Sequence, residues 1–89
     1  MLIEVATFSL VDGTDRAAFL SADHQLQEEL NGRPGFVRRT TAEGEHGWVV
    51  ITLWADEASA TAAANVIVDH EFSGLVRDID SRQCHDIGG

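Results

Sequence analysis

Cysteine, basic residues and tyrosine are scarce or missing in this sequence. It contains one cysteine, Cys84, and no tyrosine. A lone thiol forms no internal disulfide, so a cross-linked secreted scaffold is excluded and the cytoplasm is the expected compartment. Only 6 basic residues stand against 15 acidic ones, which gives a formal net charge of -9. Nucleic acids and anionic membranes attract clustered basic residues, so we expect neither as a partner.

Long apolar runs and the common ligand motifs are also missing. No window approaches the roughly 18 apolar residues of a membrane-spanning helix, and the first residues lack the pattern of a signal peptide. No His, Cys or Asp grouping has metal-ligand spacing, and no glycine-rich loop has a phosphate-binding pattern. We therefore expect no metal and no cofactor. Cys84 has no evident base beside it, so we expect no catalytic thiol.

The segment from Trp48 to Asp56 is the most informative part of the sequence that remains. It is a run of β-branched and aromatic residues of strand length, which predicts a central β-strand. Side chains alternate between the faces of a strand, and here neither face is polar. One face carries Trp48, Val50, Thr52 and Trp54, and the other carries Val49, Ile51, Leu53 and Ala55.

The other segments predict a single domain over residues 1–89 in the order strand, helix, strand, strand, helix, strand. Arg38 and Arg39 suit an edge strand. The second helix is capped at Asp56 and either runs unbroken to about Asp80 or breaks near residue 70. The expected elements are a strand at 2–11, a helix from Thr14 or Asp15 to Leu30, strands at 36–41 and 48–56, the second helix, a strand at 82–87 and a Gly88-Gly89 tail.

This order predicts a ferredoxin-like α+β fold, βαββαβ, with a four-stranded antiparallel sheet and both helices on one face. The helices cover only one face of the doubly apolar central strand. A chain of 89 residues also buries only about 60–65% of its unfolded surface, which is marginal for a monomer. We therefore expect a homodimer in which the second face of each sheet packs against a partner.

A set of residues spread over nearly the whole chain forms one further pattern. It consists of Phe19, Pro34-Gly35-Phe36, Arg39, Gly47-Trp48, Trp54-Ala55-Asp56-Glu57-Ala58, His70 and Phe72. This pattern resembles the dimeric α+β barrel superfamily, and within it the antibiotic-biosynthesis-monooxygenase-like domains. The resemblance implies two facing sheets, with ligands held between each subunit's sheet and helices. Members include cofactor-free monooxygenases of aromatic polyketides or quinols, and haem-degrading enzymes.

The haem-degrading members of this superfamily share a narrower pattern, which this chain lacks. That pattern combines an amide side chain on the first strand with a Trp late in the third strand and a His about ten residues later. Here Trp54 matches, but the other two positions hold Thr7 and Ala64. Haem is therefore not the expected substrate.

Asp23 is the first candidate catalytic residue, because it interrupts the apolar stripe of Phe19, Leu26 and Leu30 on the first helix. An ionised carboxylate is costly to bury, so it must be paired, protonated or hydrated. It would act as a general base or orient a phenolic hydroxyl. The alternatives are a salt bridge to an arginine, such as Arg38 or Arg77, or exposure to water.

His70 is the second candidate, because it matches the family position and exchanges protons near neutral pH. Its alternative role is that of a helix-kink residue bonded to the backbone. Asn65 and Asp69 would line the pocket with it, unless the helix ends early and leaves them in a turn. Trp54 and Phe36 would confine an aromatic substrate, although core packing is the commoner role of such residues.

Three hypotheses for function follow. The favoured one is a cofactor-independent monooxygenase acting on a small aromatic substrate of quinol or polyketide type. The second is a non-enzymatic homodimer that binds a small ligand or serves as an accessory subunit. The third is an isomerase or cyclase acting on a polyketide or lactone.

Overall fold

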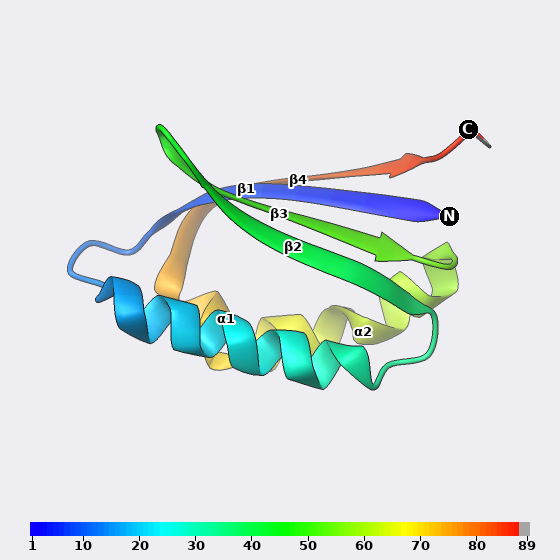
Figure 1. The fold of residues 1–89 in the computed structure, drawn as a ribbon, viewed down its shortest axis with the longest axis horizontal. Coiled ribbons are helices and arrows are strands. Elements are labelled where there is room, and N and C mark those ends of the chain that lie inside the picture. The colour runs from blue at the N-terminus through cyan, green and yellow to red at the C-terminus, as the bar shows by residue number, and fades with distance from the viewer. Residues whose placement is uncertain (88–89) are drawn as a thin grey trace.

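The structure, a computed structural model, describes residues 1–87, so the predicted Gly88-Gly89 tail lies outside the described residues. Figure 1 shows a twisted sheet above a layer of helices. The elements are β1 (Leu2–Leu10), α1 (Arg16–Asn31), β2 (Phe36–Gly44), β3 (Gly47–Trp54), α2 (Glu57–Asp69), the 3-10 helix η1 (Glu71–Leu75) and β4 (Val76–His85).

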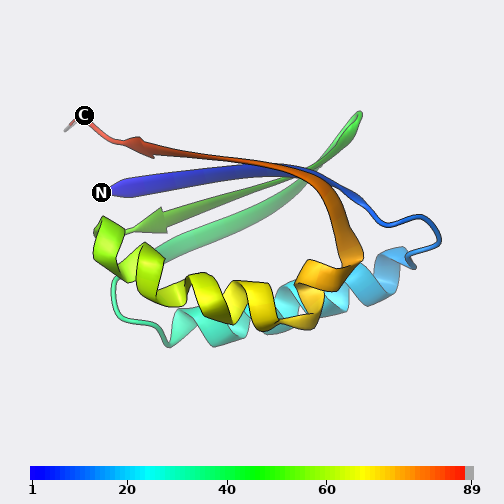
Figure 2. The same ribbon diagram turned by 180° about the vertical axis from the view of Figure 1, so that it is seen from behind.

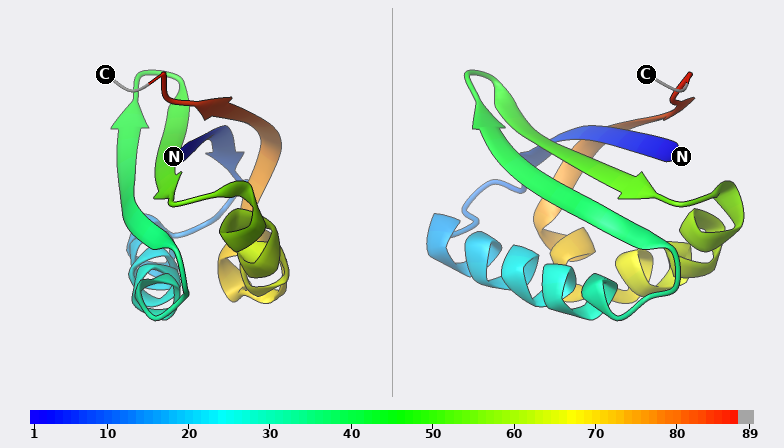
Figure 3. Two further views of the ribbon diagram at one scale, coloured as in Figure 1. Left: turned by 90° about the vertical axis from the view of Figure 1, so that its right-hand side faces the viewer. Right: turned by 45° about the vertical axis from the view of Figure 1, so that its right-hand side comes forward.

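The four strands form one antiparallel sheet in the order β2-β3-β1-β4. Both α-helices lie side by side against the same face, as the end-on view in Figure 3 shows. The ferredoxin-like α+β fold is therefore confirmed, with β3 inside the sheet and β2 at its edge as predicted. Among the described residues, no element covers the opposite face.

The core lies between the sheet and the helices. Trp48, Val50, Thr52 and Trp54 are at most 8% exposed, so the face of β3 that they share is the one beneath the helices. On the other face of β3, Ile51 is 38% exposed. The helices thus bury only one of the two apolar faces of this strand. The homodimer that would cover the second face stays a prediction.

The second helix ends at Asp69, so an unbroken helix to Asp80 is wrong and the alternative of a break near residue 70 is right. His70 adopts an extended conformation, and its ring Nδ1 accepts a hydrogen bond from the Phe72 backbone N–H at 3.1 Å. The Ser73 hydroxyl donates to the Val68 carbonyl at 2.7 Å. These bonds satisfy backbone groups at the helix end and redirect the chain.

The last strand is longer than the predicted 82–87, because it begins at Val76 and ends at His85. Its pairing with β1 extends from Leu10 opposite Val76 to Leu2 opposite His85. Figure 2 shows the chain rising from η1 directly into β4. The alternative of an unbroken helix is wrong here, since backbone pairing with β1 over nearly its full length determines the conformation.

Asp56 caps the N-terminus of α2, as predicted. Its carboxylate accepts a hydrogen bond from the Ser59 backbone N–H at 2.8 Å. This bond, followed in importance by one with the Ser59 side chain, lowers the pKa of Asp56 below its ordinary value. The cap is therefore ionised at neutral pH and weakens as the pH falls through this lowered pKa.

Gly35 allows the turn before β2 to lie against the start of α2. Its φ is +77°, and a Cβ at this position would lie 2.1 Å from the Ser59 hydroxyl oxygen. The Gly35 carbonyl also accepts a hydrogen bond from the Ala55 N–H at 2.7 Å. Only glycine meets both the backbone and the space requirement at this position.

Substitution of Gly35 by Ala should destabilise the fold more than the same change at Gly13. Gly13 has a similar φ of +83° but no atom within 4 Å of an added Cβ, so it reports the backbone cost alone. We expect Gly13→Ala to cost about 1–2 kcal/mol and Gly35→Ala at least about 1 kcal/mol more. Urea unfolding of both variants measures the difference. Equal losses would show that the contact with Ser59 has no energetic weight.

Candidate functional site

A row of polar side chains crosses the helix-facing side of the sheet. Antiparallel pairing places Gln83 opposite Glu4, Glu4 opposite Thr52, and Thr52 opposite Arg39. Partners in such a ladder project to the same face, so one residue from each strand contributes to this polar row. The neighbouring positions on β1 are Leu2, Ala6 and Phe8. The row is therefore polar within a largely apolar layer.

A cavity of about 220 Å³ lies beside the polar row, between the sheet and the helical layer. Its sheet side includes small residues, Ala6 and Ser81, where Trp48 and Trp54 fill the neighbouring space on β3. Small side chains beneath helices leave volume that large ones would occupy. The remaining lining residues are Glu4, Phe8, Leu26, Arg39, Val50, Thr52, Ile67, Val68, Phe72, Ser73, Val76 and Ile79.

Arg39 forms the cationic part of this lining and is paired with Asp23. Its Nη2 lies 2.8 Å from Asp23 Oδ1, and the two side chains are only 3% and 14% exposed. The Thr41 hydroxyl donates to the same carboxylate oxygen at 3.0 Å. Asp23 is thus paired with an arginine, but with Arg39 rather than with Arg38 or Arg77 as the sequence suggested. Arg38 follows a register shift in β2 and is exposed, and Arg77 binds Asp12 and Asp78.

Arg39 Nη1 has no hydrogen-bond partner. Among the residues that the structure describes, it is the one buried side-chain nitrogen or oxygen in this condition. The guanidinium carbon lies 5.5 Å from the centre of the Phe72 ring, which supplies a cation–π contact but no lone pair. A charged donor buried without an acceptor is costly, and such groups commonly meet a ligand or a water.

Glu4 forms the anionic part of the lining. Its Oε1 accepts a hydrogen bond from the Trp54 indole N–H at 2.7 Å, and its Oε2 accepts one from the Gln83 amide at 2.9 Å. Both bonds hold the carboxylate in one orientation, because they come from neighbouring strands on either side. Glu4 can therefore accept a proton from a bound molecule or orient its hydroxyl group.

The predicted proton-handling residues lie near the cavity without lining it. Asp23 contacts the lining through Arg39. His70 sits where α2 joins η1, with a side chain 12% exposed and Nε2 3.8 Å from a Glu29 carboxylate oxygen. Since its Nδ1 accepts the Phe72 N–H, the proton of the neutral ring is on Nε2.

The predicted substrate-binding residues are placed differently from one another. Trp54 is fully buried and supports Glu4. Phe36 packs edge-on against Trp54, with ring centres 5.5 Å apart. Asn65 and Asp69 are exposed on α2 and belong to the helix rather than to a turn. None of these four residues is among those that line the cavity.

Sequence reasoning missed Glu4, Thr52 and Arg39 as a group. A signal was present, since Glu4 interrupts the alternation of Leu2, Ala6 and Phe8 on the first strand. Its significance depends on the register, which aligns it with Arg39 across two intervening strand pairings. Register between distant segments cannot be deduced from either segment alone.

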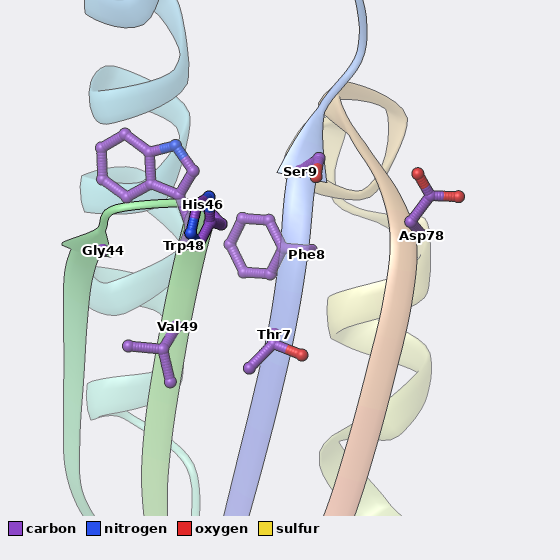
Figure 4. A pocket seen from close by; sticks show the side chains of 9 residues that line it. Thr7, Phe8, Ser9, Gly44, His46, Trp48, Val49 and Asp78 are labelled. Carbon is purple, nitrogen blue, oxygen red and sulfur yellow. The ribbon is translucent and has the colours of Figure 1, made fainter.

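A second hollow, of about 330 Å³, lies at the β2–β3 hairpin end of the sheet. Figure 4 shows Thr7 and Val49 on neighbouring strands, with His46 at the hairpin and Asp78 on β4. It is larger than the cavity beneath the helices, but His46 is 92% exposed at its rim. Its groups are therefore accessible to water, which makes it the weaker candidate for a site.

Within residues 1–87, no three His, Cys, Asp or Glu side chains are grouped so that they would hold a metal ion. No helix in the same range is long and apolar enough to cross a membrane.

No protein-family model matches this sequence, and no curated protein matches it. Solved structures do match. SnoaB, a cofactor-independent oxygenase from Streptomyces nogalater, has a TM-score of 0.83 at 19% identity over 99% of this chain and 94% of its own. A putative antibiotic biosynthesis monooxygenase from Nitrosomonas europaea has a TM-score of 0.79 at 14% identity over 98% and 99% of the two chains.

The haem degrader MhuD from Mycobacterium tuberculosis, whose structure has two haems bound in its active site, has a TM-score of 0.72. Its identity to this chain is 15%, and the match covers 98% of this chain and 96% of MhuD. At these identities the likeness establishes the fold alone. The resemblance to the dimeric α+β barrel proteins is confirmed at that level.

The ion pair yields a stability prediction. Replacement of Asp23 by Asn should cost about 3 kcal/mol, because it leaves the Arg39 charge buried and uncompensated. The double variant Asp23→Leu/Arg39→Met should have a free energy of unfolding within about 1 kcal/mol of that of the wild type, since it removes both charges together. Thr41→Val, which removes one hydrogen bond, should cost only about 1 kcal/mol. Urea unfolding measures all three; an unchanged Asp23→Asn variant would contradict the prediction.

His70 permits a separation of structural and chemical roles. His70→Ala should cost about 1 kcal/mol, because the Phe72 N–H loses its acceptor. His70→Asn should retain most of that stability, since asparagine also caps helix N-termini well. Thermal unfolding of the pair tests the cap. Equal stability of His70→Ala and the wild type would show that the bond contributes nothing.

Proposed function

We propose that this chain, which has the fold of the antibiotic-biosynthesis-monooxygenase-like proteins, oxidises a small electron-rich aromatic substrate with dioxygen and without a cofactor. One observation carries the proposal: the cavity between the sheet and the helices is mainly apolar and includes one carboxylate and one guanidinium group. An apolar cavity with a few converging polar groups is the usual form of a small-molecule site.

The size of the cavity supports a substrate of one or two rings. An engineered apolar cavity of about 150 Å³ holds benzene. The cavity here is about 220 Å³, so a substituted single ring fits without rearrangement. The Phe8 and Phe72 rings on its wall, with centres 5.7 Å apart, provide aromatic contact surfaces.

The reaction begins with removal of a proton from a phenol or hydroquinone of one or two rings. The resulting anion reduces dioxygen directly, so the substrate supplies all the electrons. One oxygen atom replaces hydrogen at a ring carbon and gives a quinone, and the other leaves as water with the two hydrogens that the substrate loses. An environment that excludes bulk water protects the reactive anion during these steps.

Asp23 and His70 are the residues that the sequence proposed for proton transfer. In the structure Asp23 is engaged by Arg39 and Thr41, and His70 caps η1. We therefore assign Asp23 to positioning and propose Glu4, which itself lines the cavity, as the group that accepts the proton. His70 stays a candidate for returning a proton through Nε2.

Trp54 and Phe36, the proposed aromatic walls, would affect the substrate only through other residues. Trp54 supports Glu4 through its indole N–H, and Phe36 packs behind Trp54. Asn65 and Asp69 lie at the surface of α2, so a contact with substrate would require a molecule that extends from the cavity. We also propose a homodimer through the uncovered sheet face, on which Ile51 is 38% exposed.

Non-enzymatic ligand binding is the second candidate. The observation that favours it is the engagement of Asp23, whose carboxylate stabilises a buried guanidinium instead of being free for proton transfer. In that case the cavity would hold a small molecule without turnover, in the same position.

Oxygen consumption tests the proposal. Purified protein free of metal and flavin should consume oxygen with members of a panel of phenols and hydroquinones that have one or two rings. Ala6→Leu, which fills the cavity, and Glu4→Gln, which removes the base, should each lower kcat/KM by about 100-fold or more. Ala64→Leu is the matched control, because the same change at an exposed position of α2 leaves the cavity intact.

No oxygen uptake with any member of the panel would remove the enzymatic proposal. Saturable binding of the same compounds without uptake, abolished by Ala6→Leu and unaffected by Ala64→Leu, would instead establish the second candidate. Equal loss of activity in both alanine variants would show that the cavity is not where the reaction occurs.

A further inference from the structure

We propose that Arg39 Nη1 is a docking point for a neutral oxygen acceptor, a carbonyl or hydroxyl oxygen of a small aromatic ligand in the cavity. The inference deepens the proposed function, on which it rests for the location of the site. It adds the chemical class of the bound group and the residue that recognises it.

The hydrogen bonds of the Arg39 guanidinium group are incomplete. Its side chain is only 3% exposed, and Asp23 engages Nη2 but not Nη1. The Phe72 ring contacts the guanidinium group without supplying an acceptor lone pair. Arg39 also lines the cavity. A ligand oxygen at this position would satisfy a charged donor that is otherwise buried without an acceptor.

The charges around the cavity favour a neutral ligand over an anion. The Arg39 cation is already balanced by Asp23, and a second carboxylate, Glu4, lines the same cavity. An anionic ligand would add a further negative charge to this set, and like charges in one site repel each other. A neutral carbonyl or hydroxyl oxygen accepts the Nη1 hydrogen bond without that cost. The structure therefore favours a ketone or phenol over a carboxylate.

The polar row sets the direction in which a bound ligand extends. Thr52 lies between Glu4 and Arg39 in the polar row, so two strand spacings, about 10 Å in total, separate their backbones. A ligand that places an acceptor oxygen at Arg39 therefore extends along the row toward Glu4. A hydroxyl group at its other end would meet the carboxylate that Trp54 and Gln83 hold in place.

Three probes of similar size test the inference on the purified protein: acetophenone, ethylbenzene and benzoate. Acetophenone has a neutral carbonyl, ethylbenzene has no oxygen, and benzoate is anionic. We expect acetophenone to bind at least about 10-fold more tightly than ethylbenzene, which corresponds to about 1.4 kcal/mol. Benzoate should bind more weakly than acetophenone. Titrations followed by protein NMR measure the affinities, and the arginine side-chain ¹⁵N signals report contact with Arg39.

Two variants locate the effect. Arg39→Met should abolish the preference for acetophenone over ethylbenzene, whereas Arg38→Met should retain it. Arg38 is the matched control, because it is an arginine of the same strand but is exposed. Thr41→Val, which weakens only the support of Asp23, should reduce the preference without abolishing it.

Equal binding of acetophenone and ethylbenzene by the wild type would overturn the inference and assign Nη1 to a water molecule only. Tighter binding of benzoate than of acetophenone would overturn the preference for a neutral ligand. These comparisons use the wild type, so they hold even if Arg39→Met fails to fold. A preference for acetophenone in a protein that consumes no oxygen would leave this inference standing while the monooxygenase proposal fails.

Discussion

The buried ion pair between Arg39 and Asp23 is the interaction on which the arrangement of the site depends. It joins the edge strand β2 to helix α1, and Thr41 from the same strand reinforces it. Its geometry leaves one guanidinium nitrogen without a partner beside the cavity. A buried ion pair contributes little net stability compared with apolar packing, but loss of one partner leaves the other charge buried and uncompensated.

The cavity results from a contrast in side-chain size across one face of the sheet. Trp48 and Trp54 fill the space at the two ends of β3, and aromatic contacts with Phe19 and Phe36 extend these filled regions. Between them the sheet presents Val50 and Thr52, with Ala6 on the neighbouring strand. The helices rest on the large residues, so space remains above the small ones.

The polar row places two opposite charges, Glu4 and Arg39, at different positions along the cavity. Glu4 is held by residues of β3 and β4, whereas Arg39 is held by Asp23 of α1, to which Thr41 of β2 donates a hydrogen bond. The two opposite charges are thus supported by separate sets of residues. Such support fixes side chains in defined orientations before a ligand arrives, which is what binding and catalysis require.

Several features followed directly from local sequence patterns. The doubly apolar run from Trp48 to Trp54 identified β3, and the position of Asp56 identified a helix start. The order of elements then led to the ferredoxin-like sheet, since few connections are compatible with it. Only one of the two alternatives for the second helix placed residues 76–80 in it, and pairing with β1 makes this stretch a strand instead.

By itself the sequence determined the fold, because periodicity within each segment identifies the elements and their order limits the possible connections. It also singled out Asp23 as a carboxylate in an apolar stripe, which is a property of one segment. Only the tertiary structure decided that its partner is Arg39, that Glu4 and Thr52 share a row with that arginine, and that the cavity lies beside them. These relations join residues from different strands and helices. They arise from strand register and packing, which no single segment of the chain contains.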